Sequence, residues 1–130
     1  MFFESFFKCK ILVVEDDPFF KAMLVPVIMD QESKAEIHWV GSVEDAQKKL
    51  QSNRYSLIIS DYFLTGKENG IDLWRHCSAS YPKIPFILMS GLSTEAIKKL
   101  LLKSLSGPRY LKKPFVFAEC RKTIAEMLKR

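Results

Sequence analysis

Cysteine and histidine are scarce in this sequence, and neither is arranged as a metal or disulfide framework. The three cysteines, Cys9, Cys77 and Cys120, are far apart, and no Cys-x-x-Cys pair occurs. An odd and dispersed set of cysteines argues against a disulfide-stapled domain and against a zinc site. The two histidines, His38 and His76, add no metal-ligand spacing, and the simplest interpretation of each is a surface or half-buried side chain.

Long hydrophobic runs and an export signal are also missing. No apolar run reaches the roughly 20 residues that a membrane-spanning helix needs. Residues 1–8 contain four phenylalanines but also Glu4, and they lack a basic segment followed by an apolar stretch. We therefore expect no membrane contact, a cytoplasmic location, and a Phe-rich N-terminal leader over residues 1–8 whose role stays open.

The composition is that of one globular domain with an uneven charge. Of the 130 residues, 48% are hydrophobic and 27% are charged, which is enough material for a buried core. Residues 1–90 carry 10 Lys/Arg and 12 Asp/Glu, whereas residues 91–130 carry 10 and 3. The basic end is compatible with an acidic partner such as nucleic acid, lipid or protein, and equally with a solvated face of two Lys-rich helices.

Apolar runs of strand length alternate with segments of helical periodicity. Strands are predicted at 10–14, 36–40, 57–61, 84–90 and 108–112. Helices are predicted from Pro18 to about Gln31 with a kink or break at Pro26, from Ser42 to about Ser52, from Ile71 to near Tyr81, from Ser93 through Leu105, and from about Phe117 to Leu128. Short connections and the absence of repeats and linkers predict one doubly wound α/β domain over residues 9–130.

Polar and charged side chains stand at the carboxyl ends of four predicted strands. Glu15 and Asp16 follow the first strand, Asp61 ends the third, Ser90 ends the fourth, and Lys113 follows the fifth. In a parallel sheet these ends share one edge, where the side chains can converge. Clustered carboxylates repel one another unless a hard cation binds between them, and oxygen ligands favour Mg²⁺.

Asp61 has a further chemical use at such an edge. With Mg²⁺ and Lys113 neutralising charge, its carboxylate can attack a phosphoryl group in line and form an aspartyl phosphate. Ser90 offers a hydroxyl to one phosphoryl oxygen, and Lys113 offers an ammonium to another. Each residue alone is also common at turns, but the combination at four of five strand ends favours a phosphoryl site.

Four segments together resemble the receiver domains of two-component response regulators. They are Ile-Leu-Val-Val-Glu-Asp-Asp-Pro (11–18), Leu-Ile-Ile-Ser-Asp (57–61), Ile-Leu-Met-Ser-Gly (87–91) and Tyr-Leu-Lys-Lys-Pro-Phe (110–115). The resemblance covers about residues 9–130, with the segments in the family's order and at its spacings. It implies a flavodoxin-like parallel sheet of five strands in the order 2-1-3-4-5, accompanied by five helices.

The resemblance also implies a role for individual residues. Asp61 matches the phosphoacceptor, and Ser90 and Lys113 match the hydroxyl and the lysine that act beside it. Ser90 and Tyr110 match the pair that switches on phosphorylation, while Asp17 is more simply a helix cap. The implied ligands of Mg²⁺ are Asp16, Asp61, the backbone carbonyl of Phe63, and Glu15 acting through water.

A histidine kinase or histidine phosphotransfer protein is the implied source of the phosphoryl group. Phosphorylation should then draw Ser90 toward the phosphoryl group, turn Tyr110 inward, and change the surface of the fourth helix, fifth strand and fifth helix. A homodimer through that face is one expected outcome, and direct nucleic-acid binding is not expected. The cognate kinase, the output, and whether the chain stands alone or belongs to a longer protein stay open.

Two apolar residues bear on the lifetime of the phosphorylated state. Phe63 lies two residues after Asp61, and Leu92 lies two residues after Ser90. Neither side chain can hydrogen-bond an attacking water or accept its proton. We therefore expect Mg²⁺-dependent self-phosphorylation and slow self-dephosphorylation rather than a multiple-turnover enzyme.

Two other classes of protein share parts of this pattern. A haloacid-dehalogenase-type phosphatase would use Asp61 as its nucleophile, but that chemistry resembles an Asp-x-Asp pair, and residue 63 is Phe. A non-phosphorylated interaction domain of the same fold would bind a partner through residues 91–130, but the intact set of site residues argues against a degenerate site. Multiple turnover of a phosphate ester would favour the first alternative, and absence of phosphate incorporation would favour the second.

Overall fold

Strands and helices alternate along the chain in the predicted order. The computed structural model describes residues 9–101 and 107–129, so the predicted leader and Leu105 lie outside the described residues. The elements are β1 (Lys10–Val14), α2 (Pro18–Gln31), β2 (Glu36–Val40), α3 (Val43–Ser52), β3 (Leu57–Asp61), α4 (Gly70–Ser80), β4 (Phe86–Ser90), α5 (Thr94–Leu101), β5 (Arg109–Lys112) and α6 (Phe117–Leu128).

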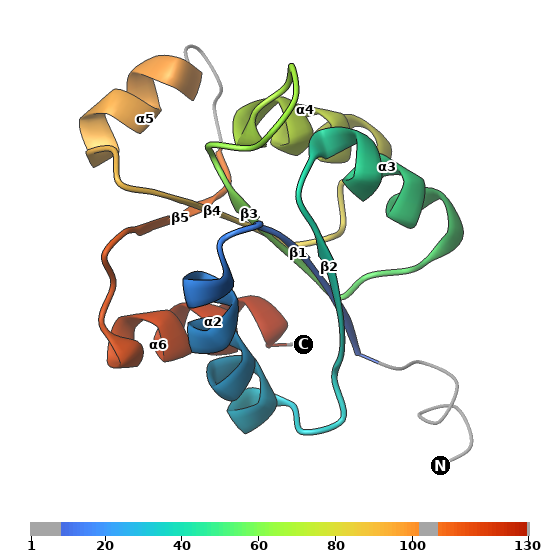
Figure 1. Cartoon of the computed structure of the whole chain (residues 1–130), viewed down its shortest axis with the longest axis vertical. Coiled ribbons are helices and arrows are strands. Elements are labelled where there is room, and N and C mark those ends of the chain that lie inside the picture. The colour runs from blue at the N-terminus through green and yellow to red at the C-terminus, as the bar shows by residue number, and fades with distance from the viewer. Residues whose placement is uncertain (1–8, 102–106, 130) are drawn as a thin grey trace.

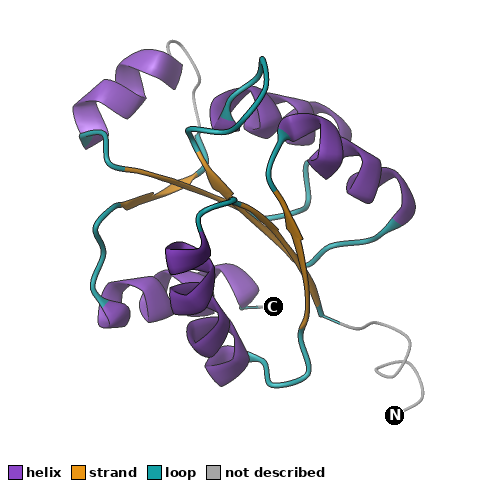
Figure 2. Ribbon diagram, in the orientation of Figure 1, coloured by secondary structure: helices purple, strands orange, loops and turns teal. Residues whose placement is uncertain are grey.

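The five strands form one parallel sheet in the order β2-β1-β3-β4-β5, which confirms the predicted flavodoxin-like topology. Helices α2 and α6 cover one face of this sheet, and α3, α4 and α5 cover the other (Figure 1). Figure 2 shows the helices on both sides of the strands. Among the described helices, none combines the length and the apolar character needed to cross a membrane.

The core consists of two apolar layers, one on each face of the sheet. Along β1, Ile11 and Val13 pack toward α2 and α6, whereas Leu12 and Val14 pack toward α3 and α4. All four side chains are completely buried, because successive residues of a covered strand point to opposite faces. This double burial explains the continuous apolar runs in the sequence, and it holds the carboxyl ends of the strands in fixed positions.

Two strands begin after a proline and are shorter than the apolar runs predict. β4 begins at Phe86 rather than Ile84, and β5 begins at Arg109 rather than Pro108. Pro85 has no N–H to donate to the sheet, although its carbonyl accepts a hydrogen bond from the Ile58 N–H at 3.0 Å. Proline does not interrupt α2, which runs through the exposed Pro26 as one helix, so the break predicted there does not occur.

Capping side chains define where most helices begin. Asp17 caps α2 and Ser42 caps α3, each accepting a hydrogen bond from a backbone N–H of the first turn. At α4, Asn69 and Asp72 form a reciprocal capping box. The N-cap of α6 is Val116, which makes no side-chain capping bond. The starts of α2 and α6 therefore differ chemically, although both lie beside the carboxyl edge of the sheet.

Candidate phosphoryl-transfer site

Three of the predicted site residues meet at the carboxyl edge of the sheet. Lys113, directly after β5, has its Nζ 3.1 Å from Oε2 of Glu15 and 3.5 Å from Oδ1 of Asp61. Glu15 directly follows β1, and Asp61 is the last residue of β3. Parallel pairing brings these strand ends together, so residues 98 positions apart in the chain form an ion pair.

This ion cluster is largely shielded from water. The exposed fractions of the side chains are 2% for Glu15, 13% for Lys113 and 14% for Asp61. Burial, and after it the charge of Asp61, raises the pKa of Glu15 to about 7, although Lys113 acts in the opposite direction. Burial and the charge of Asp61 therefore disfavour the ionised form of Glu15 more than Lys113 favours it.

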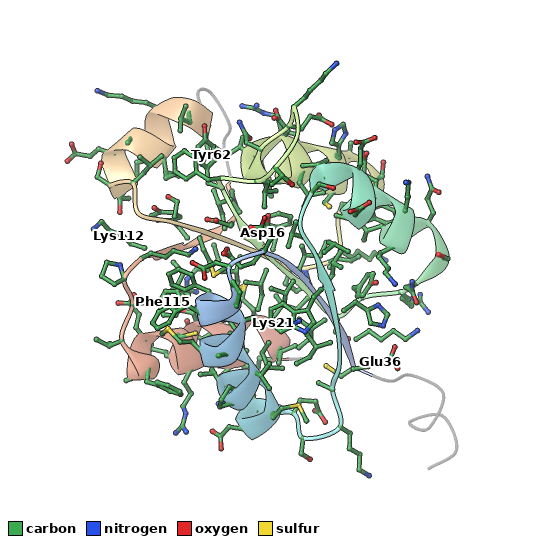
Figure 3. The ribbon with its side chains drawn as sticks, in the orientation of Figure 1. Asp16, Lys21, Glu36, Tyr62, Lys112 and Phe115 are labelled. Atoms are coloured by element: carbon green, nitrogen blue, oxygen red, sulfur yellow. The ribbon has the colours of Figure 1, made fainter. Side chains whose placement is uncertain are left out.

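Asp16 lies beside this cluster rather than inside it. Its side chain is exposed in the loop from β1 to α2 (Figure 3), close to Gly41, where an added Cβ would come within 3.3 Å of the Asp16 Cβ. Asp17 follows and acts as the predicted cap, accepting from the Phe19 N–H at 2.9 Å. Across the described ranges, no three His, Cys, Asp or Glu side chains are gathered closely enough to form a metal site by themselves.

The chemistry of the edge nevertheless fits Mg²⁺. Mg²⁺ prefers oxygen ligands and usually keeps several waters, so two or three protein oxygens are sufficient. Glu15 and Asp61 supply carboxylate oxygens, and Asp16 adds a third carboxylate after the same strand as Glu15. The backbone carbonyl of Phe63 belongs to the loop that leaves β3. None of these ligands is a soft donor that would favour zinc or copper.

Ser90 and Tyr110 form a second group next to the ion cluster. The Ser90 Oγ lies 2.6 Å from the Tyr110 hydroxyl, which is 2.5 Å from the Leu92 carbonyl, and the Leu92 N–H donates to Ser90 Oγ at 3.1 Å. A phenol has one proton, so a Tyr110 that donates to a carbonyl accepts the proton of Ser90. The Lys113 N–H donates to the Ser90 carbonyl at 2.7 Å, which joins the two groups through the backbone.

A glycine holds the loop after β3 close to Asp61. A Cβ at Gly70 would lie 2.3 Å from the Asp61 carbonyl oxygen and 2.8 Å from Cδ1 of Leu88. Within the same loop, Gly66 adopts a φ of +94°, a conformation that favours glycine. The Thr65 hydroxyl donates to the Gly41 carbonyl at 3.1 Å. Backbone contacts thus fix this loop on both sides of its turn.

A sequence model of the response regulator receiver domain family matches residues 11–125. This match includes the whole sheet except Lys10, the first residue of β1, and every residue of the ion cluster. The chain belongs to the response regulator receiver domain family.

Solved structures of bacterial receiver proteins share this fold over almost their full length. A putative response regulator from Chloroflexus aurantiacus has 23% identity and a TM-score of 0.76, covering 95% of this chain and 100% of its own. The chemotaxis response regulator CheY4 of Vibrio cholerae has 23% identity and a TM-score of 0.77, and the match covers 94% of this chain and 100% of CheY4. A two-component response regulator from Clostridium difficile has 24% identity and a TM-score of 0.78, with 95% and 98% covered. At such identities, the similarity concerns the fold alone.

This receiver domain also has an apolar rim around its ion cluster. Its members are large side chains on the starts of α2 and α6 and on the loop after β3: Phe19 (64% exposed), Phe63 (63%), Val116 (68%) and Phe117 (52%). Phe63 packs edge-on against Tyr62, with ring centroids 4.8 Å apart. Large exposed apolar side chains on the loops and helix starts at the carboxyl edge of the sheet are typical of a contact surface for another molecule.

One neighbour of the ion cluster was not predicted as a site residue. Phe20 belongs to the apolar stripe of α2 and, on sequence evidence, is core packing. In the receiver domain its ring lies under the Lys113 ammonium, with Nζ 3.6 Å from the ring centroid. Helical periodicity cannot reveal this contact, because it depends on how α2 and the loop after β5 are placed relative to each other. The position of Phe20 in the first turn, four residues after Asp16, is the only local signal.

Proposed function

We propose that this receiver domain accepts a phosphoryl group on Asp61 from the phosphohistidine of a histidine kinase or histidine phosphotransfer protein. The proposal assigns residues 9–130 to the domain and Mg²⁺ to the edge formed by Glu15, Asp16, Asp61 and the Phe63 carbonyl. The observation that supports it best is the shielded contact of the Lys113 Nζ with both Glu15 and Asp61, at 3.1 and 3.5 Å.

The side chains at this edge are suited to in-line phosphoryl transfer. An Asp61 carboxylate oxygen attacks phosphorus, the P–N bond of the phosphohistidine breaks, and the imidazole leaves with the electron pair. Lys113, now paired with Asp61, is placed to pair with a phosphoryl oxygen once that carboxylate has formed its new P–O bond. When bound, Mg²⁺ neutralises charge on the phosphoryl oxygens.

Ser90 and Tyr110 supply the proposed response to phosphorylation. To donate its proton to a phosphoryl oxygen, Ser90 must give up its 2.6 Å hydrogen bond to Tyr110. Tyr110 belongs to β5, and the Leu92 carbonyl, to which its hydroxyl donates, lies just before α5. A change in this hydrogen-bonded group would therefore alter the α5–β5–α6 face, which we propose as the binding surface for a target or for a second copy of the chain.

The apolar rim favours a protein as the physiological phosphodonor. A small phosphodonor has no use for four exposed apolar side chains, whereas a protein partner can bury them around its reactive histidine. Receiver domains in general interact with histidine kinases and phosphotransfer proteins. We therefore propose that Phe19, Val116 and Phe117 contribute to docking and have little part in the chemistry.

The test is incorporation of phosphate from acetyl phosphate, followed by intact mass spectrometry. We expect one phosphoryl group per chain in the presence of Mg²⁺, and none after chelation or in Asp61→Asn. Asp30→Asn is a matched control, because Asp30 forms an exposed ion pair with Arg121 at 2.8 Å, away from the strand ends. Incorporation by Asp61→Asn equal to that of the unaltered protein would contradict the proposal, and continued turnover of the donor would indicate a phosphatase.

A further inference from the structure

We propose that Phe20 is a positioning residue whose aromatic face fixes the Lys113 ammonium between Glu15 and Asp61. The consequence for phosphorylation rests on the proposed function, whereas the contact itself can be tested without any phosphodonor.

The Lys113 ammonium has three neighbours on three sides. Its Nζ lies 3.1 Å from Glu15 Oε2, 3.5 Å from Asp61 Oδ1, and 3.6 Å from the centroid of the Phe20 ring. A cation within about 6 Å of a ring centroid is attracted by the negative face of the ring. Because only 13% of the Lys113 side chain is exposed, water competes little with this attraction.

The Phe20 ring is itself held by its surroundings. It occupies the first turn of α2, whose start is defined by the Asp17 cap and by Pro18. The ring lies 6.1 Å from that of Phe115, at an angle of 51°, and Phe115 is 7% exposed. Phe115 follows Lys113 by two positions, so this ring contact joins α2 to the loop that carries the lysine (Figure 3 labels Phe115 beside α2). The aromatic face therefore has a defined position under the ammonium.

An aromatic ring suits this position better than the other side chains of similar reach. A further carboxylate would add a third negative charge beside those of Glu15 and Asp61. An aliphatic side chain would offer the ammonium no electrostatic partner. A ring attracts the cation without taking up one of its N–H donors in a strong hydrogen bond. Lys113 can thus exchange its contact with Asp61 for a phosphoryl oxygen while it remains above the ring.

Substitutions at position 20 can separate the aromatic face from apolar bulk. Phe20→Leu and Phe20→Met keep an apolar side chain but remove the face, and Phe20→Tyr keeps the face. Trp39→Leu is the matched control, because it removes a ring from a separate cation–π contact, in which the Lys21 Nζ lies 5.0 Å from the Trp39 centroid. Phe20→Met is a second test if Phe20→Leu folds poorly, and circular dichroism checks the fold of each variant.

The first measurement is the proton chemical shift of the Lys113 ε-methylene in isotope-labelled protein, without metal or phosphodonor. A methylene held over a ring face is shifted upfield, so we expect an upfield shift in the unaltered protein, in Phe20→Tyr and in Trp39→Leu. We expect its loss in Phe20→Leu and Phe20→Met. A shift near the random-coil value in the unaltered protein would overturn the proposed contact, whether or not Asp61 is phosphorylated.

The second measurement is the initial rate of phosphorylation by acetyl phosphate at saturating Mg²⁺. We expect phosphate incorporation to be about tenfold slower in Phe20→Leu, because a shielded cation–π contact is lost. The rate should recover in Phe20→Tyr, which keeps the aromatic face. In a Lys113→Ala background, Phe20→Leu should cause no further loss, because both changes act through the same ammonium. If the methylene shift is lost but the rate is unchanged, the positioning role is refuted. If no chain incorporates phosphate while the shift behaves as expected, the proposed function fails and the contact stands.

Discussion

Glu15, Asp61 and Lys113 act together because each is shielded from water. An exposed ion pair contributes little, since water screens the charges and the side chains lose freedom when they pair. At exposed fractions of 2%, 14% and 13%, the three side chains interact much more strongly. The same shielding makes an unbalanced charge costly. The cluster is therefore suited to receiving a cation and a phosphoryl group, both of which redistribute its charge.

Two apolar residues, one after Asp61 and one after Ser90, predict that the proposed aspartyl phosphate at Asp61 is long-lived. Phe63 is 63% exposed and Leu92 is half-buried, and neither can orient a water for attack on the aspartyl phosphate. We expect Phe63→Asn to accelerate loss of the phosphoryl group by about tenfold or more, because an amide can hydrogen-bond the attacking water. Intact mass spectrometry after removal of the donor follows the decay. Phe63→Leu is the control and should decay slowly, whereas equally slow decay in Phe63→Asn would disprove the explanation.

A second prediction concerns the effect of substituting Gly70 on stability. A methyl group at this position would lie 2.3 Å from the Asp61 carbonyl oxygen and 2.9 Å from Cα of Tyr62, and these backbone atoms cannot easily move. We expect Gly70→Ala to lower the free energy of unfolding by about 3 kcal/mol. Urea denaturation measures the change. Gly91→Ala is the matched control, because its Cβ would lie 4.0 Å from the nearest atom, the Lys113 carbonyl oxygen, and the two variants should therefore differ clearly.

At the scale of elements, the starts of α2 and α6 carry most of the side chains around the site. α2 begins with a proline after an Asp cap, a combination that stabilises the helix start and places Phe20 under the Lys113 ammonium. The N-cap of α6 is Val116, whose side chain cannot accept a hydrogen bond from the first turn and which exposes 68% of its surface. A residue that is poor as a cap and apolar in water is better explained by a contact with a partner than by stability.

Val116→Ser should separate the effect of this position on stability from its effect on docking. A serine at the N-cap can accept a hydrogen bond from the first turn of α6, so we expect the free energy of unfolding to rise by about 1 kcal/mol. The same change removes apolar surface from the rim, and phosphoryl transfer from a protein donor should become slower while transfer from acetyl phosphate is unchanged. Val116→Ala is the control for loss of apolar surface without a new cap. A more stable variant with unaltered transfer from a protein donor would exclude Val116 from docking.

At the scale of the whole molecule, a covered parallel sheet holds both apolar layers and the site. Two cysteines report on the integrity of these layers. Cys77 of α4 is 2% exposed and Cys120 of α6 is 1% exposed, on opposite faces of the sheet. Burial raises the pKa of each thiol from 9.0 to about 11, and Glu119 adds to the effect at Cys120. Both thiols therefore stay neutral and inaccessible in the folded chain.

Stability should accordingly fall at alkaline pH. The pKa of Cys77 and of Cys120 in the folded chain lies above the ordinary value. Their contribution to the free energy of unfolding is therefore complete below pH 9.0 and is lost as pH rises toward about 11. We expect the urea midpoint to decrease over this interval, and to decrease less steeply in the Cys77→Ala/Cys120→Ala double variant. Labelling with a thiol reagent provides a second readout, and rapid reaction of both thiols at pH 8 without urea would contradict their burial.

The structure also shows where the basic side chains of residues 91–130 lie. Four of these side chains are exposed on the elements after Ser90, namely Lys98 and Lys99 of α5, Arg109 of β5 and Arg121 of α6. Arg109 pairs with Glu126 and Arg121 pairs with Asp30, so part of this charge is compensated within the fold. The net charge of the segment therefore overstates what a partner would meet on the α5–β5–α6 face.

The sequence by itself determined the order of the elements, the parallel sheet, and the residues at its carboxyl edge, because apolar runs, caps and strand-end polar residues are local signals. Only the tertiary structure decided which of these residues touch. It joined Lys113 to Glu15 and Asp61, left Asp16 exposed beside them, and paired Ser90 with Tyr110. It also placed the Phe20 ring under the ammonium. Such contacts link segments far apart in the chain, so they depend on how helices pack against the sheet, which no local pattern encodes.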